Sequence, residues 1–200
     1  MFQLPPATAI NKPLYKKAVF EKFNFKAAER DRFDADISRM ALVARVSTAT
    51  VPALTKGKEI EGFYVLQVAL KRKDYDSKNI LMLQKLIPQK LIYAMQYEEQ
   101  TQFCIFHTRL QQSRWMPTSE AAITLHGLSL DDVWNCIVAT IGGLDAQVEE
   151  TIEEQIIHRE QQEKLLRQIE SLEKLCRTEK QTRKKYELHQ QLIKLKEGLK

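Results

Sequence analysis

The chain has 200 residues, 44% of them hydrophobic, and its 31 basic and 26 acidic residues give a formal net charge of +5. This length suits one globular domain with an appendage. The longest apolar runs, LVARV and CIVATIGGL, are much shorter than the roughly 20 residues that span a bilayer, so we expect no membrane span. The first residues, MFQLPPATAINKPLYKK, lack the pattern of a secretory signal, which favours a cytoplasmic location.

The first 32 residues contain prolines at positions 5, 6 and 13 and show little periodicity. We therefore expect an arm that lies over the surface of a domain extending from residue 33 to residue 146. In the segment RFDADISRMALVARVS, apolar side chains then recur at helical spacing. This spacing predicts a helix whose inward face carries Ile37, Met40, Ala41 and Ala44.

The segment FYVLQVALKR, residues 63–72, alternates with a period of two and is largely apolar on both sides. This pattern predicts a central strand that is covered on both faces. SKNILMLQKLIP predicts a helix that is capped by Ser77 and stopped by Pro88. LIYAMQYEEQTQFCIFHTRL then predicts two strands joined by a tight turn at Glu98 to Thr101.

A further helix is predicted after Ser129, a favourable N-cap, and Gly142 is placed to end it. Asp131 and Asp132 lie in its first turn. Adjacent residues do not share a helix face, so these acids fit compensation of the helix dipole better than paired catalysis. Together the elements predict an α+β or α/β fold, with a small mixed β-sheet flanked by helices.

Residues 147–200 are rich in Glu, Gln, Lys, Arg and Leu, which is typical of coiled-coil helices. Apolar residues step by four and three in two sets, which are Leu165, Ile169, Leu172 and Cys176, and then Leu188, Leu192 and Leu195. The two sets are out of heptad phase, so the chain should break between them, where Thr178 and Gln181 have capping-box spacing. We expect a coiled-coil-like helical hairpin, and one long helix with a stutter is the alternative.

Three cysteines, at positions 104, 136 and 176, stand far apart among apolar residues. An odd number with this spacing favours reduced thiols over a disulfide framework. Cys104 and His107 have C-x-x-H spacing, but no second pair follows, and a structural zinc ion takes four ligands. The chain also lacks the glycine patterns that bind nucleotide phosphates. The sequence therefore predicts neither a metal site nor a cofactor.

The lysine that ends the central strand raises the question of a nuclease. Nucleases of the restriction-enzyme fold place a carboxylate two residues before such a lysine, where it helps to hold a divalent ion. Here Lys71 is present, but Ala69 takes the position of the acid and Gln67 lies on the same face. A core strand with a terminal lysine is therefore favoured over an active nuclease. Gln67, Lys71 and His107 remain the candidate catalytic residues.

Basic residues gather in the arm, after the central strand and in the tail. Each cluster alone fits a solvated surface, whereas useful affinity for nucleic acid requires several phosphate contacts. A composite nucleic-acid-binding face would combine Lys16, Lys17, Lys71, Arg72, Lys73, Arg183, Lys184 and Lys185.

Five segments, taken in order, carry a family resemblance: LPPATAINKPLYKKAVFEKF, EIEGFYVLQVALKRKDYDSKNILMLQKLIP, LIYAMQYEEQTQFCIFHTRL, GLSLDDVWNCIV and EKQTRKKYELHQQLIKLKEGL. Over essentially its whole length the chain resembles a bacterial family catalogued as domain of unknown function 4391. Many of its members have acids where this chain has Gln67 and Ala69, giving a pattern like E-x-E-x-K. The resemblance implies that an activity based on those acids is lost here. It also implies accessory proteins encoded beside DNA methyltransferases and helicases of restriction-like phage defence systems.

The leading hypothesis is a non-catalytic accessory protein that docks a DNA methyltransferase or a helicase through its helical tail. The partner-binding residues would be Leu165, Ile169, Leu172, Leu188, Leu192 and Leu195. The tail could instead pack on its own domain or pair with a second copy to give a homo-oligomer. The alternatives are a DNA-binding protein that uses the basic clusters and a degenerate nuclease.

Overall fold

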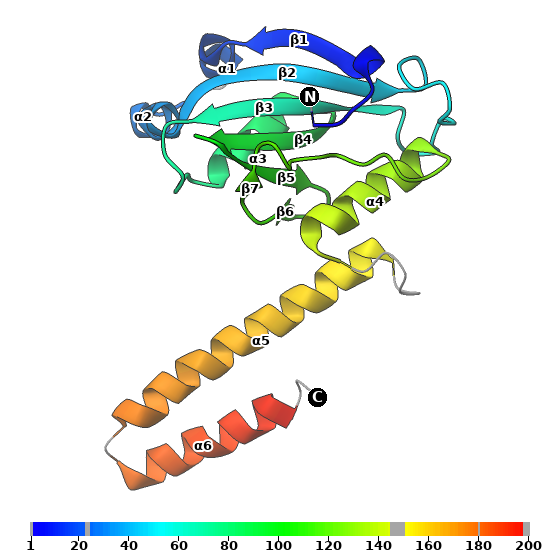
Figure 1. The fold of residues 1–200 in the computed structure, drawn as a ribbon. Helices are drawn as coiled ribbons and strands as arrows, with labels where there is room; N and C mark the ends of the chain where they lie inside the picture. The colour runs from blue at the N-terminus through cyan, green and yellow to red at the C-terminus, as the bar shows by residue number, and fades with distance from the viewer. Residues whose placement is uncertain (1, 23–24, 145–150, 180, 198–200) are drawn as a thin grey trace. The chain divides into compact units, whose positions relative to one another are not determined.

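A computed structural model describes residues 2–22, 25–144, 151–179 and 181–197 (Figure 1). The chain divides into two compact units, Met1–Gln147 and Val148–Lys200. The boundary that we expect between residues 146 and 147 lies outside the described residues. No described helix has the length and apolar character needed to cross a bilayer.

The first unit is built on one seven-stranded mixed sheet in which strands β1 to β6 follow one another in chain order and β7 pairs with β5. The strands are β1 (Ala9–Leu14), β2 (Ile37–Ser47), β3 (Gly62–Leu70), β4 (Lys90–Tyr97), β5 (Gln100–Phe106), β6 (Leu110–Gln112) and β7 (Met116–Pro117). The helices are the 3-10 turn η1 (Pro6–Thr8), α1 (Lys16–Lys22), α2 (Ala27–Asp36), α3 (Lys78–Leu86) and α4 (Leu130–Gly142). The predicted α+β class is confirmed.

The strand pairing follows from the connections. β3 and β4 are parallel, whereas the other pairs of neighbouring strands in the described sheet are antiparallel. A parallel pair requires a crossover connection, which α3 supplies. β4 and β5 form the predicted antiparallel hairpin, and Glu98 adopts a positive φ of 52° in the turn between them.

β3 lies at the centre of the sheet, as predicted, between β2 and β4. On one face, Leu66, Val68 and Leu70 join a buried cluster with residues of α1, α2 and α3. On the other face, the Phe63 ring packs against Trp134 of α4 with ring centroids 5.5 Å apart. This second face is fully buried only over the first half of β3, because Gln67 and Ala69 remain half-exposed. The partly open end of the strand becomes part of a surface hollow.

The helix expected from residue 33 to residue 44 is wrong beyond Asp36, because Ile37–Ser47 is strand β2. Bulges explain the misleading spacing. The pairing of β2 with β3 shifts register between Ile37 and Arg39, so one extra residue is inserted. Ile37 and Met40, three residues apart, therefore join the same buried cluster from a strand.

The N-terminal segment forms regular structure rather than an arm lying over the domain. Its strand β1 is the edge strand of the sheet and pairs with β2, with Pro13 opposite Ala41. An edge position tolerates proline, because one side of the strand needs no backbone donor.

The predicted helix ends are only partly correct. Ser129 caps α4 in a capping box with Asp132, as predicted. Ser77 makes no side-chain cap for α3, and the Asp76 carboxylate instead accepts from the backbone N–H of Lys78 at 2.9 Å. α4 ends at Gly142, as predicted, and Gly143 follows as its C-cap in the left-handed conformation, with φ 62°.

The second unit is a helical hairpin made of α5 (Ile152–Thr178) and α6 (Thr182–Glu197). α6 turns back along α5 (Figure 1), and Lys196 forms an ion pair of 2.8 Å with Glu173. The alternative of one long helix is therefore wrong. Thr178 does not cap α6, because it ends α5 and its hydroxyl donates to the Lys174 carbonyl.

The Asp131 carboxylate ties the start of α4 to the loop before β3. It accepts hydrogen bonds from the backbone N–H of Lys58 at 2.6 Å, Ile60 at 2.9 Å and Glu59 at 3.3 Å. Gly57 permits this approach, because a Cβ there would lie only 2.1 Å from Asp131 Oδ1. Burial opposes ionisation of this carboxyl, but the backbone hydrogen bonds hold its pKa below the ordinary value.

We expect Asp131→Asn to lower the melting temperature by about 2–8 °C at neutral pH, because an amide cannot accept all of these hydrogen bonds. A lowered folded-state pKa gives stability that is complete above the unfolded-state pKa and is lost as pH falls through the folded pKa. The difference in melting temperature between wild type and variant should therefore shrink below about pH 4. Thermal unfolding at several pH values measures it. Asp74→Asn, at an exposed position, is the control, and an equal effect of both substitutions would contradict the role of Asp131.

Candidate functional site

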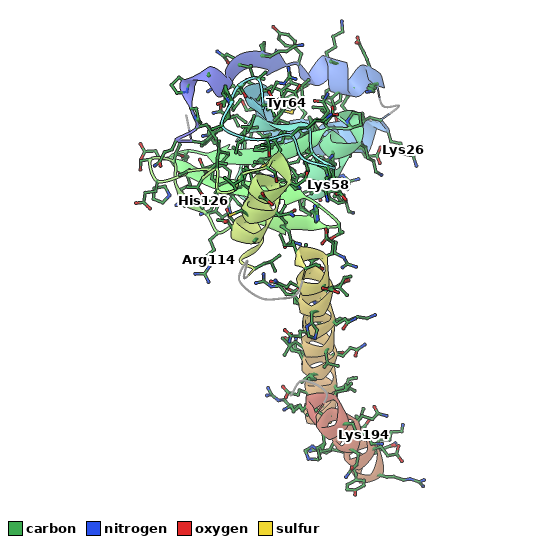
Figure 2. All side chains as sticks on the ribbon, turned by 90° about the vertical axis from the view of Figure 1, so that its right-hand side faces the viewer. Lys26, Lys58, Tyr64, Arg114, His126 and Lys194 are labelled. Atoms are coloured by element: carbon green, nitrogen blue, oxygen red, sulfur yellow. The ribbon has the colours of Figure 1, made fainter. Side chains whose placement is uncertain are left out.

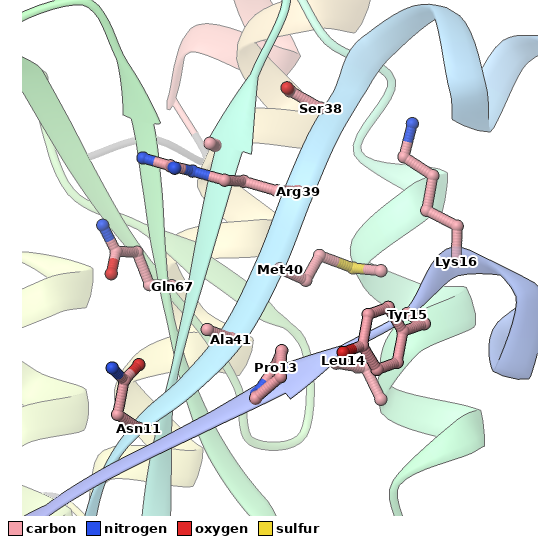
Figure 3. A pocket seen from close by; sticks show the side chains of 11 residues that line it. Asn11, Pro13, Leu14, Tyr15, Lys16, Ser38, Arg39, Met40, Ala41 and Gln67 are labelled. Carbon is pink, nitrogen blue, oxygen red and sulfur yellow. The ribbon is translucent and has the colours of Figure 1, made fainter.

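A hollow of about 480 Å³ lies beside β2, at the point where β1 ends. β1 covers the edge of β2 only as far as the pair Leu14–Met40, so the preceding residues of β2 have no partner from β1. The polar side chains that line the hollow come from Asn11, Tyr15, Lys16, Ser38, Arg39 and Gln67. Figure 3 shows Arg39 and Gln67 on one side of β2 and Tyr15 and Lys16 on the other.

Arg39 is the charged group of the hollow that is not neutralised. It is exposed, and among the described residues its guanidinium has neither an ion pair nor a hydrogen-bond partner. Figure 3 shows the side chain extending over β3 toward the side where Gln67 lies. Guanidinium groups bind carboxylate and phosphate oxygens through paired donors. An anionic ligand in the hollow would therefore meet an available donor.

A row of polar side chains continues from the hollow across the same face of the sheet. The Gln67 amide donates to Gln96 Oε1, and the Gln96 amide donates in turn to Thr101 at 3.4 Å. Thr101 shares a hydrogen bond of 2.9 Å with Thr118. These residues come from β3, β4, β5 and the segment after β7. The row fixes the orientation of Gln67, because each amide is held by the next side chain.

Lys16 and Lys71 meet at one carboxylate next to the hollow. Lys16 Nζ lies 2.5 Å from Asp34 Oδ1, and Lys71 Nζ lies 3.2 Å from Asp34 Oδ2. Hydrogen bonds from Lys16 and then Lys71 hold the pKa of the Asp34 carboxyl below its ordinary value. Two ammonium groups share one carboxylate, so this trio keeps one net positive charge.

Asp36 is a buried carboxylate with a different role. Its side chain is 0% exposed and pairs with Arg72, while its Oδ2 accepts from the Asp76 backbone at 2.9 Å and the Asn79 amide at 2.7 Å. These partners all lie between the end of β3 and the first turn of α3. Asp36 therefore anchors the connection that carries Lys71, Arg72 and the start of α3.

The other basic residues named from the sequence are spread over both units. Lys73 donates to Gln100 at 2.6 Å and lies 5.3 Å from the centre of the Trp115 ring. Lys17 pairs with Glu21 on α1. Arg183 pairs with Glu187 on α6, where Lys184 and Lys185 are exposed. The structure thus brings Lys16 and Lys71 together, whereas the tail cluster belongs to the other compact unit.

The candidate catalytic residues do not form one cluster. Gln67 is bonded to Gln96, and Lys71 is bonded to Asp34 rather than aligned with Gln67. His107 Nδ1 lies 3.4 Å from the indole N–H of Trp134, which donates to it. No nucleophile-base pair can be assembled from these contacts, and their catalytic role stays a prediction.

Within the described parts of the chain, no three His, Cys, Asp or Glu side chains gather as a metal site would require. The three cysteines are free thiols, as expected. Burial raises the pKa of the Cys104 thiol to about 11, so it is protonated at neutral pH.

The predicted partner-binding residues of the tail lie largely inside the hairpin. Ile169 and Leu192 are buried, and the other four are half-buried: Leu165, Leu172, Leu188 and Leu195. The large apolar side chains that are exposed on the described parts of the two helices are instead Ile157, Leu166, Leu175, Tyr186 and Ile193.

Sequence reasoning missed Arg39, Tyr15 and Asn11 as parts of a site. The sequence pattern predicts a helix at Arg39 and an arm without sheet pairing at the other two residues. No period-two signal marks this part of β2, because Ser38 and Arg39 are both exposed next to the bulge and only then follows buried Met40.

Comparison with known proteins gives one result. A family model described as a domain of unknown function (DUF4391) matches residues 2–199. No curated protein and no solved structure matches the chain.

We expect Asp36→Ala to lower the free energy of unfolding by about 3 kcal/mol, because it leaves Arg72 and the buried Asn79 amide without their acceptor. Asp34→Ala, two residues earlier, removes only exposed ion pairs and should have a much smaller effect. Urea unfolding of both variants measures the difference. Equal losses would mean that burial does not distinguish the two carboxylates.

Proposed function

This chain belongs to the family described as a domain of unknown function (DUF4391), and we propose that it is a non-catalytic accessory protein that docks a larger partner through its helical hairpin. The partner class is a DNA methyltransferase or a helicase of a restriction-like phage defence system, which is what the family resemblance implies.

The observation that carries this proposal is the set of large apolar side chains that the hairpin leaves in solvent. Leu166 is 53% exposed and Leu175 is 51% exposed on α5, and Tyr186 is 64% exposed on α6. Tyr186 and Ile193 are seven residues apart, which places them on one face of α6. Tyr186 and Ile193 thus form an exposed apolar pair on one helix face, which suits a binding surface, whereas Leu166 and Leu175, nine residues apart, lie on opposite faces of α5.

The hairpin also has its own internal interface, which changes the expected docking residues. Ile169 and Leu192 are buried, so they are not available to another protein without opening the hairpin. Helix-in-groove recognition uses anchors on an outer face of a helix. The exposed set on α5 and α6 therefore replaces the buried set as the proposed contact surface.

The contacts of Gln67 and Lys71, the candidate nuclease residues, support the non-catalytic part of the proposal. Lys71 has an acidic partner, Asp34, and Gln67 is held by Gln96. Position 69 carries alanine where a metal-binding acid is expected. These residues fit a sheet surface with fixed hydrogen bonds.

Two paired substitutions on the full chain test the docking. We expect Tyr186→Gln with Ile193→Gln, or Leu166→Gln with Leu175→Gln, to abolish co-purification with a co-expressed methyltransferase or helicase, because each pair removes apolar anchors. Purification followed by mass spectrometry measures the retained partner.

The control is Gln168→Ala with Gln191→Ala, at exposed polar positions of the same helices, which should retain the partner. Circular dichroism checks that the hairpin persists in each variant. If both apolar pairs retain the partner, or the wild type retains none, docking through the hairpin is wrong. Loss of self-association instead of a partner would indicate a homo-oligomer.

A further inference from the structure

We propose that the hollow beside β2 binds a single-stranded nucleic acid, with Arg39 and Lys16 at the phosphates and Tyr15 stacked on a base. This binding is independent of the hairpin and of any protein partner, because every residue involved belongs to the first compact unit.

The charge around the hollow favours a polyanion. Arg39, Lys16 and Lys71 supply three positive charges, and Asp34 supplies one negative charge. The balance of this group is therefore +2, counted as three cations less one carboxylate. Arg39 keeps its donors free among the described residues. Lys16 is fixed next to the hollow by its ion pair, so it loses little side-chain freedom on binding.

An exposed aromatic side chain stands at the rim. Tyr15 lines the hollow, yet 70% of its surface is exposed to solvent. Large aromatic side chains that combine with cations in a groove are typical stacking platforms for unpaired bases. A duplex does not offer such a base face, because its bases are stacked on one another. The aromatic rim therefore favours a single strand over a duplex.

Amide groups that line the hollow can meet base edges. Gln67 is oriented by its bond to Gln96, and the Asn11 amide is exposed without a partner in the described part of the chain. Amides offer both donors and acceptors, which match the polar edges of splayed bases. The volume of about 480 Å³ lies in the range of ligand-binding pockets.

The ligand extends beyond one nucleotide because the cations do not all lie in the hollow. Arg39 and Lys16 line it on opposite sides of β2 (Figure 3). Lys71 is not among the lining residues and forms an ion pair with Asp34, which Lys16 also contacts. A strand that passes the open edge of β2 can meet these charges in succession. A mononucleotide carries too few phosphates to use them all.

Fluorescence anisotropy of the full chain with a short labelled oligothymidylate tests this assignment. We expect binding that weakens with added salt, and a loss of at least about fivefold in affinity for Arg39→Gln and for Tyr15→Ala. The slope of log affinity against log salt concentration should be shallower for Arg39→Gln than for the wild type, by an amount that corresponds to about one phosphate contact.

Two matched variants serve as controls. Tyr15→Phe keeps the ring and should retain affinity, which separates stacking from a role of the hydroxyl. Arg114→Gln makes the same charge change at an exposed side chain that projects from the first unit (Figure 2) and should bind like the wild type. Thermal unfolding of each variant identifies any that fail to fold, and the exposed positions of Arg39, Tyr15 and Arg114 make such a failure unexpected.

Several results would overturn the assignment. These are absence of binding, equal loss for Arg39→Gln and Arg114→Gln, and affinity that is unchanged in both hollow variants. Duplex DNA bound as tightly as the single strand would exclude the stacking role of Tyr15. Thymidine monophosphate bound as tightly as the oligonucleotide would restrict the hollow to a small phosphate ligand.

Discussion

The buried carboxylate of Asp36 is the interaction on which the first unit depends. It stands at the end of α2, fully excluded from solvent, and accepts from Arg72, the Asp76 backbone and Asn79. Removing a charge from water costs several kcal/mol unless such partners replace the solvent. Because the partners lie between β3 and α3, one side chain joins the start of β2 to the end of β3. The backbone N–H of Lys71 also donates to the Asp36 carbonyl at 2.7 Å, which strengthens this junction.

That junction determines where the charged groups of the surface stand. Lys71 follows the end of β3, and Arg39 follows the start of β2, so both are positioned from the same corner of the sheet. Lys16, on α1, forms an ion pair with Asp34 at this corner. The hollow and the hairpin thus offer two surfaces of different chemistry. One is polar and cationic on a rigid sheet, and the other is apolar on a separate helical unit.

The errors of the sequence reasoning concentrate at β1 and β2 and have one physical cause. A regular strand alternates with period two, but the bulges in β2 place Ile37 and Met40 on one face at a spacing of three. In a short window this is the same as helical periodicity. With β2 predicted as a helix and the proline-containing N-terminus as an arm, the sequence brings Tyr15, Asn11 and Arg39 into no common site. Lys16 and Gln67 were named, but for separate reasons.

The sequence by itself determined the elements whose signals are local. Alternation defined β3, the stepped leucines and their phase break defined the hairpin, and Ser129 with its acids defined the start of α4. Only the tertiary structure decided which side chains meet. Asp36 with Arg72, Lys16 with Lys71 and Arg39 with Gln67 come from segments far apart in the chain. Their proximity depends on strand register and bulges, which follow from packing of the whole sheet and leave no periodic trace in the sequence.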